Sequence, residues 1–291
     1  MVYCSKQLGE QMKKKSMPSQ TKTVDEFKKY VKQMLIPSQT KTVDELKEYS
    51  TCNWHAEIKL NDRVRYMSIY EQERSEILKD DWNYYINSHG YRENWRLEKH
   101  TKKIGFFGCS CTFGIGTHHD AIFSSVVEKH YGSDIVESLN MGLPGSGIQR
   151  IAKLVSAANR IIDFDTVVLT LPTSSRFLVL DDTNLMCDVV PGFVKPSIET
   201  QAKFIHGEFG QNNLDMYFID YVHWIMAELK STRRVLWSTW CKETYKILES
   251  IIDQKDLLPM WHFVDKGRDP HPGVQSHFNH ATAIIEKLGK I

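Results

Sequence analysis

Residues 104–117 read IGFFGCSCTFGIGT, an apolar run that breaks abruptly into glycines and small polar residues. This pattern predicts a buried strand that ends in a tight loop. In open α/β sheets, ligands bind at the carboxyl ends of the strands, where such a loop would lie. Glycines let the backbone pass close to a bound group, and successive loop amides can point at a negative charge. Taken alone, the loop is open to two interpretations, a phosphate cradle or the site of a nucleophile, Ser110.

Downstream of Lys102 the pattern alternates between strand and helix, which predicts a parallel sheet covered by helices on both faces. The helices are expected at 119–131, 146–163, 213–230, 241–254 and 274–288. The strands are expected at 103–109, 134–139, 166–171, 233–238 and 260–264. Prolines and glycines interrupt this rhythm between Arg176 and Asn213, where we expect an inserted loop or hairpin.

Two further segments precede this domain. Residues 1–53 contain a tandem repeat, because MPSQTKTVDEFKKY at 17–30 returns 19 residues later as IPSQTKTVDELKEY at 36–49. Each copy carries a Thr-x-x-Glu capping box and predicts a short amphipathic helix, which either packs on the main domain or docks a partner. Residues 54–101 are polar and rich in aromatics, and we expect them to wrap the sheet edge. The chain is therefore divided into an N-terminal helical extension, this wrap, and an α/β domain over 102–291.

The composition limits the partners, the location and the metal content that we expect of the protein. A formal net charge of +1 favours neither nucleic acid nor an anionic membrane as a partner. No apolar stretch is long enough to span a membrane, and the first residues lack the apolar core of a signal peptide. The six cysteines have no framework spacing and are expected to be free thiols in a reducing compartment, so a cytoplasmic location is predicted. The Cys109-x-Cys111 pair fits no common zinc pattern, and no metal is expected.

Four polar stretches should meet at the carboxyl edge of this sheet, and together they suit acyl transfer. A serine such as Ser110 needs a base to remove its proton, and a histidine such as His271 suits that role near neutral pH. Asp269 lies two residues before His271, across a rigid proline, and is expected to orient the imidazole. The backbone amides of Ser110 and Gly145 are candidate donors to the oxyanion. The four stretches are 108–114, 140–147, 171–176 and 268–273.

At these positions the chain resembles the SGNH (GDSL) hydrolase family. The family pattern G-D-S-x-x-x-G matches Gly108, Ser110 and Gly114, with Cys109 in place of the aspartate. The second block, an asparagine followed by an oxyanion-hole glycine, matches Asn140 and Gly145.

The last two blocks of the family fit less closely. An aspartate shortly before a histidine matches Asp269 and His271, although the usual spacing is one residue longer. The third block, G-x-N-D, is not met, and its asparagine position falls near Ser174. The resemblance covers residues 102–289.

The resemblance implies a flavodoxin-like three-layer α/β/α sandwich, for which the sequence predicts a five-stranded parallel sheet, and an esterase, lipase or carbohydrate deacetylase without metal or organic cofactor. The expected triad is Ser110, His271 and Asp269, with Ser110, Gly145 and Ser174 as the oxyanion hole and Arg176 as a substrate-binding candidate or a solvated loop residue. The expected substrate is a small-molecule, glycan or lipid ester, such as an acetyl ester.

Two other hypotheses stay open. The missing third-block asparagine and the short spacing between Asp269 and His271 are compatible with a binding or scaffold protein that is catalytically weak or inactive. A phosphate- or nucleotide-binding module built on Gly108–Gly116 is the other, although it gives the Asp269-His271 stretch no role.

Overall fold

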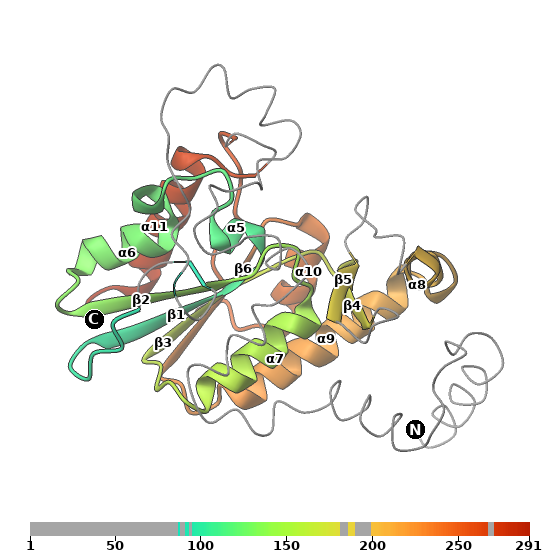
Figure 1. Cartoon of the computed structure of the whole chain (residues 1–291), viewed down its shortest axis with the longest axis horizontal. Coiled ribbons are helices and arrows are strands. Elements are labelled where there is room, and N and C mark those ends of the chain that lie inside the picture. The colour runs from blue at the N-terminus through green and yellow to red at the C-terminus, as the bar shows by residue number, and fades with distance from the viewer. Residues whose placement is uncertain (1–86, 88–90, 93–94, 181–185, 190–198, 267–270) are drawn as a thin grey trace.

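The computed structural model of the chain describes the main domain and a few residues before it (Figure 1). The tandem repeat in residues 1–53 lies outside the described residues, as do most of the 54–101 segment and Asp269. The predicted helical extension and the division into domains therefore stay predictions. The described residues are 87, 91–92, 95–180, 186–189, 199–266 and 271–291.

A parallel sheet with the strand order β2-β1-β3-β6 forms the centre of the molecule. Placing the first strand between the second and the third gives the doubly wound order of flavodoxin-like sheets. The carboxyl ends of all four strands therefore meet at one edge, where α5 lies in Figure 1. The strands are β1 (Lys102–Gly108), β2 (Val136–Gly142), β3 (Thr166–Leu171) and β6 (Arg234–Thr239).

The fifth strand expected at 260–264 does not form, although the chain does run beside β6. Leu258 N donates to Trp237 O at 2.8 Å, and Trp261 N donates to the carbonyl of the last residue of β6 at 2.9 Å. A regular parallel ladder would need every second residue as donor, so this pattern slips by one residue across Pro259. Proline has no N–H and is poorly tolerated inside a sheet, which explains why only an isolated bridge remains.

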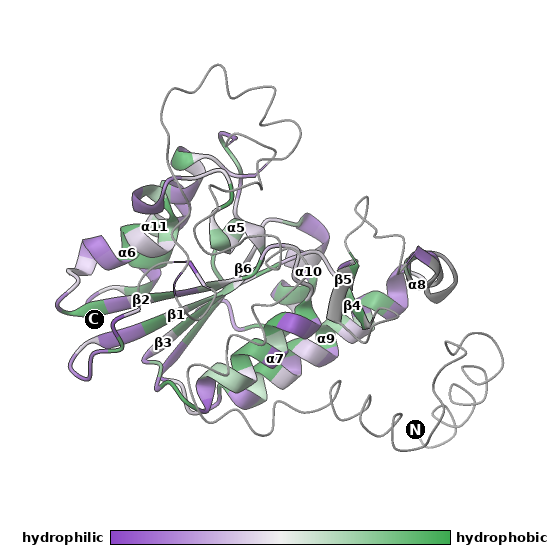
Figure 2. Cartoon of the chain, viewed as in Figure 1, coloured by the Kyte–Doolittle hydropathy of each residue, from purple (hydrophilic) through white to green (hydrophobic). Residues whose placement is uncertain are grey.

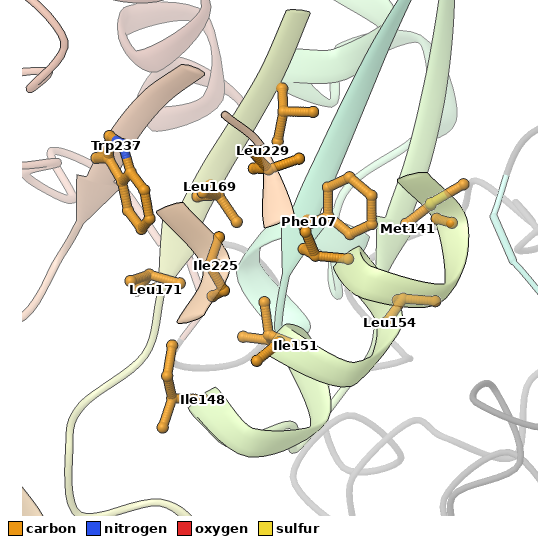
Figure 3. Close-up of a cluster of buried hydrophobic side chains, with 14 of the residues drawn as sticks. Phe107, Met141, Ile148, Ile151, Leu154, Leu169, Leu171, Ile225, Leu229 and Trp237 are labelled. Carbon is orange, nitrogen blue, oxygen red and sulfur yellow. The ribbon is translucent and has the colours of Figure 1, made fainter. Parts of the chain in front are cut away.

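Helices cover both faces of the sheet, which confirms the α/β class. Successive strand residues point to opposite faces, so Phe107 joins the core under α7 and α9, while Phe106 joins the core under α6 and α11. Figure 3 shows Phe107 and Leu169 facing Ile151 of α7, and Figure 2 shows the hydrophobic residues along the strands and on α7 and α9. The helices are α6 (Phe123–Tyr131), α7 (Ile148–Asn159), α9 (Gln211–Glu228), α10 (Lys242–Ile251) and α11 (Val274–Leu288).

The expected insertion contains a hairpin. An antiparallel pair, β4 (Phe177–Leu180) and β5 (Met186–Val189), precedes α8 (Glu199–Lys203) and the π-helical segment η4 (Phe204–Phe209). The hairpin packs on the start of α9 through a small separate core that includes Val179, Val189 and Leu214. The hairpin thus lies directly after the polar loop that follows β3.

Candidate active site

The loop that carries Ser110 is shaped by its glycines. β1 ends at Gly108, and the single-turn helix α5 (Ser110–Phe113) follows. A Cβ atom at Gly108 would lie 2.0 Å from Thr112 Oγ1 and 2.6 Å from Thr170 O, so only glycine fits there. Gly114 has φ +78° and closes the turn by donating its N–H to Ser110 O at 2.9 Å. Ser110 is held in this turn with only 4% of its surface exposed.

A buried arginine holds the far side of the same loop. Arg92 is fully buried, and its guanidinium donates to the carbonyl oxygens of Phe113 at 2.9 Å, Gly114 at 2.5 Å and Thr117 at 2.6 Å. The bond to Phe113 satisfies a carbonyl that the short helix leaves without an intrahelical donor, and the other two hold the turn that follows the helix. Sequence reasoning missed Arg92, because a lone arginine in an aromatic-rich segment belongs to no periodic pattern.

Asn140 lies inside β2, whereas we expected it after the strand. Its fully buried side chain donates through Nδ2 to Thr112 O at 2.8 Å and to Ser124 Oγ at 3.1 Å. Its Oδ1 accepts the N–H of Gly142 at 3.0 Å. Asn140 therefore fastens the Ser110 turn to the neighbouring strand and to α6.

The loops after β1, β2 and β3 are in contact, as the strand order predicts. Leu143 N donates to Gly108 O at 3.0 Å, which joins the first two loops. Gly145 has φ +81° in the turn that follows. A Cβ atom at Gly147 would lie 2.7 Å from Arg176 O, so the second loop also lies against the third.

The His271 stretch reaches the Ser110 loop through a hydrogen bond. Thr117 Oγ1 donates to Pro272 O at 3.2 Å, and half-buried His271 is the preceding residue. The position of this stretch is fixed by Asp265, whose carboxylate accepts the amides of the second and third residues of α11 at 2.9 and 2.7 Å. Sequence reasoning missed Asp265, because a cap supplied from another segment leaves no local motif. The roles of His271 and of Asp269, which lies outside the described residues, stay predictions.

Ser174 has a different partner from the one its predicted role requires. Its hydroxyl donates to Asp215 Oδ1 at 2.6 Å and accepts from Gln211 Nε2 at 2.9 Å. A serine hydroxyl carries one hydrogen, and here that hydrogen points to α9. A role in the oxyanion hole would require this hydrogen to turn away from the Asp215 carboxylate.

Two buried thiols flank the candidate nucleophile, and Cys109 Sγ lies 3.4 Å from Ser110 Oγ. Burial, together with the hydrogen bond to Cys109, raises the pKa of the Cys111 thiol. Burial acts in the same direction on Cys109, but the hydrogen bond with Cys111 and the charge of Arg176 outweigh it and hold the pKa of the Cys109 thiol well below its usual value. The positive charge of Arg176 thus acts on the thiols of both residues next to Ser110 in the sequence.

Comparison with known proteins gives likenesses in structure only. No family model matches the chain, and no curated protein matches it. A member of the lipolytic G-D-S-L family from Veillonella parvula aligns with a TM-score of 0.42 and 11% identity, over 64% of this chain and 97% of that one. A catalytic mutant of Axe2, an acetylxylan esterase from Geobacillus stearothermophilus, aligns with a TM-score of 0.41 and 12% identity, over 65% and 95%.

The chain is similar in structure to proteins of the G-D-S-L type, the family that its motifs resemble, at low identity and low TM-score. Likenesses of this size assign no activity and no substrate to this chain.

The described residues bring a serine, a histidine stretch and several loop amides to one edge of the sheet. The same residues include no group of three or more His, Cys, Asp and Glu side chains placed to hold a metal ion. They also include no helix with the length and hydrophobicity that crossing a bilayer requires.

Proposed function

We propose that the protein is a serine hydrolase that cleaves esters with a small acyl group, such as acetyl esters of a sugar or lipid. The observation that carries this proposal is the position of Ser110 on a constrained turn at the carboxyl end of the central strand β1. A hydrogen bond between Thr117, in the loop that carries Ser110, and Pro272 joins this loop to the stretch that contains His271. A nucleophile and a base at adjoining loops are what acyl transfer requires.

In the proposed mechanism Ser110 Oγ attacks the ester carbonyl while His271 takes its proton. Asp269 orients His271 and stabilises the imidazolium. The amides of Ser110 and Gly145 donate to the oxyanion of the tetrahedral intermediate. His271 then returns the proton to the leaving alcohol, and a water molecule activated by the same histidine hydrolyses the acyl-enzyme.

Hydrolysis of p-nitrophenyl acetate by purified protein tests the proposal. We expect Ser110→Ala and His271→Asn to lower kcat by about 10³-fold or more, because loss of one member of a catalytic triad removes most of the activity of the whole triad. His262→Asn and Ser250→Ala, at exposed positions outside the candidate site, serve as matched controls and should retain the parent rate. Equal rates in the Ser110→Ala and parent proteins would refute the proposal. Absence of turnover with any short-chain ester would favour a binding or scaffold protein.

A further inference from the structure

We propose that Arg176 and Trp240 form a subsite beside Ser110 for an anionic group of the ester substrate, a carboxylate or a phosphate. This inference rests on the proposed function, since it names the class of substrate that the same site would accept.

The strand register brings these two residues together. Leu171, the last residue of β3, pairs with Thr239, the last residue of β6. The two strands therefore leave the sheet side by side, and Trp240 follows at once while Arg176 ends the short loop after β3. The Arg176 guanidinium carbon lies 5.9 Å from the centre of the Trp240 ring. This contact is a cation–π interaction between two loops of the candidate site.

The aromatic partner is itself fixed from another element. The Trp240 ring stacks on Phe263 with ring centres 6.4 Å apart and an angle of 26° between the planes. Trp240 therefore offers a supported surface to the guanidinium. A guanidinium donates hydrogen bonds in its own plane, and its fork matches the two oxygens of a carboxylate or phosphate.

The proposed subsite adjoins the loops of the candidate active site. The Arg176 backbone lies against Gly147, two residues after the candidate oxyanion donor Gly145. The charge of Arg176 contributes to the lowered pKa of the Cys109 thiol and opposes the rise that burial and the bond to Cys109 cause in the pKa of the Cys111 thiol. Both thiols are buried, and charges interact strongly where water is excluded. The loop that ends at Arg176 lies against the loop after β2, and that loop is hydrogen-bonded to Gly108, two residues before Ser110. A substrate anion held by Arg176 would therefore place the rest of the molecule near Ser110.

The subsite predicts that the full-length protein prefers anionic acetyl esters to neutral ones. This preference can be measured with three matched acetyl esters: 4-acetoxybenzoate, 4-acetoxyphenyl phosphate and the neutral methyl 4-acetoxybenzoate. We expect kcat/KM to be at least tenfold higher for one of the anionic esters than for the neutral one, and the better anion identifies the class. Arg176→Gln should remove that preference. The control Arg233→Gln removes a positive charge from an exposed position at the opposite end of β6. This variant should keep the preference for the anionic ester. An equal kcat/KM for all three esters in the parent protein, or a preference that survives Arg176→Gln, would overturn the subsite.

A second variant covers the case in which Arg176→Gln does not fold. Trp240→Leu keeps the charge but removes the surface that orients it, so the anion preference should fall at least threefold. A preference that is unchanged in Trp240→Leu would contradict the role given to the stacked pair.

Binding separates this inference from the proposed function. If none of the esters is hydrolysed, the proposed esterase is wrong, and the amide analogues 4-acetamidobenzoate and 4-acetamidophenyl phosphate still test the subsite by calorimetry. Binding of one of them that weakens at least tenfold in Arg176→Gln or in Trp240→Leu would support it. Absence of binding, or equal binding to the parent and the variants, would overturn it.

Discussion

His277 and His280 lie about one turn apart on the buried side of α11. His277 Nδ1 accepts the N–H of Phe123 at 3.4 Å, and the His280 ring stacks on Trp261 with the ring centres 4.2 Å apart. Burial lowers the pKa of each imidazole to about 3. Both side chains are therefore neutral in the folded protein at neutral pH, although in an unfolded chain they would titrate near pH 6.5.

These two histidines make stability depend on pH. Below about pH 6.5 the unfolded chain binds protons that the folded protein does not, so the free energy of unfolding should fall as the pH decreases. Each histidine contributes up to about 1.4 kcal/mol per pH unit. Urea denaturation between pH 5 and 7.5 should show a shallower slope for His280→Phe than for the parent. The control His130→Asn changes an exposed histidine and should keep the parent slope. A slope that is unchanged in His280→Phe would contradict this account.

The residue scale also shows what the sequence could not predict. The apolar spacing of 274–288 predicts a helix, and α11 forms over that range. Whether a histidine on such a helix is charged depends on the rings that pack against it. Phe123 and Trp261 are distant in sequence, and no local pattern links them to His280.

At the scale of elements, the N-terminus of α11 depends on Asp265. Its carboxylate accepts the amides of Gln275 and Ser276, in the first turn of the helix. Asp265→Ala should lower the free energy of unfolding by about 1 kcal/mol, the usual effect of losing an N-terminal cap. It should also lower ester hydrolysis, because the cap fixes the helix that follows the His271 stretch.

Asp253→Ala is the matched control for this prediction, measured by urea denaturation and by rate. Asp253 is exposed and its carboxylate forms an ion pair with exposed Lys255, so loss of this side chain should change stability by less than about 0.5 kcal/mol. Equal effects of the two substitutions on stability and rate would show that Asp265 does not stabilise α11 as its N-terminal cap.

The errors in the predicted elements have local physical causes. β3 matches its predicted range, 166–171, because the run TVVLTL, rich in β-branched residues and buried on both faces, is a strong signal. The strand expected at 260–264 does not form, because Pro259 interrupts the hydrogen-bond ladder to β6. β2 continues to Gly142, past the point where polar Asn140 indicated its end. The Asn140 side chain is satisfied by contacts across the fold, which a strand pattern cannot reveal.

At the scale of the whole molecule, the order of strands and helices predicts that the loops of the candidate site share one edge of the sheet. The residues that fix these loops come from elsewhere in the chain. Arg92 precedes the sheet, Asp265 follows its last strand, and Asp215 on α9 binds Ser174. Each contact joins residues from different segments of the chain, which explains why motif spacing indicated the candidate site but not its supports.

The central claim is that Ser110 is the activated nucleophile of this molecule, and labelling with a fluorophosphonate tests it most directly. Peptide mapping by mass spectrometry after labelling of the full-length protein should place a single phosphonate adduct on Ser110. The adduct should be absent from Ser110→Ala and should form much more slowly in His271→Asn, because the hydroxyl then lacks its base. An adduct that persists in Ser110→Ala, or that maps to another residue, would contradict the account.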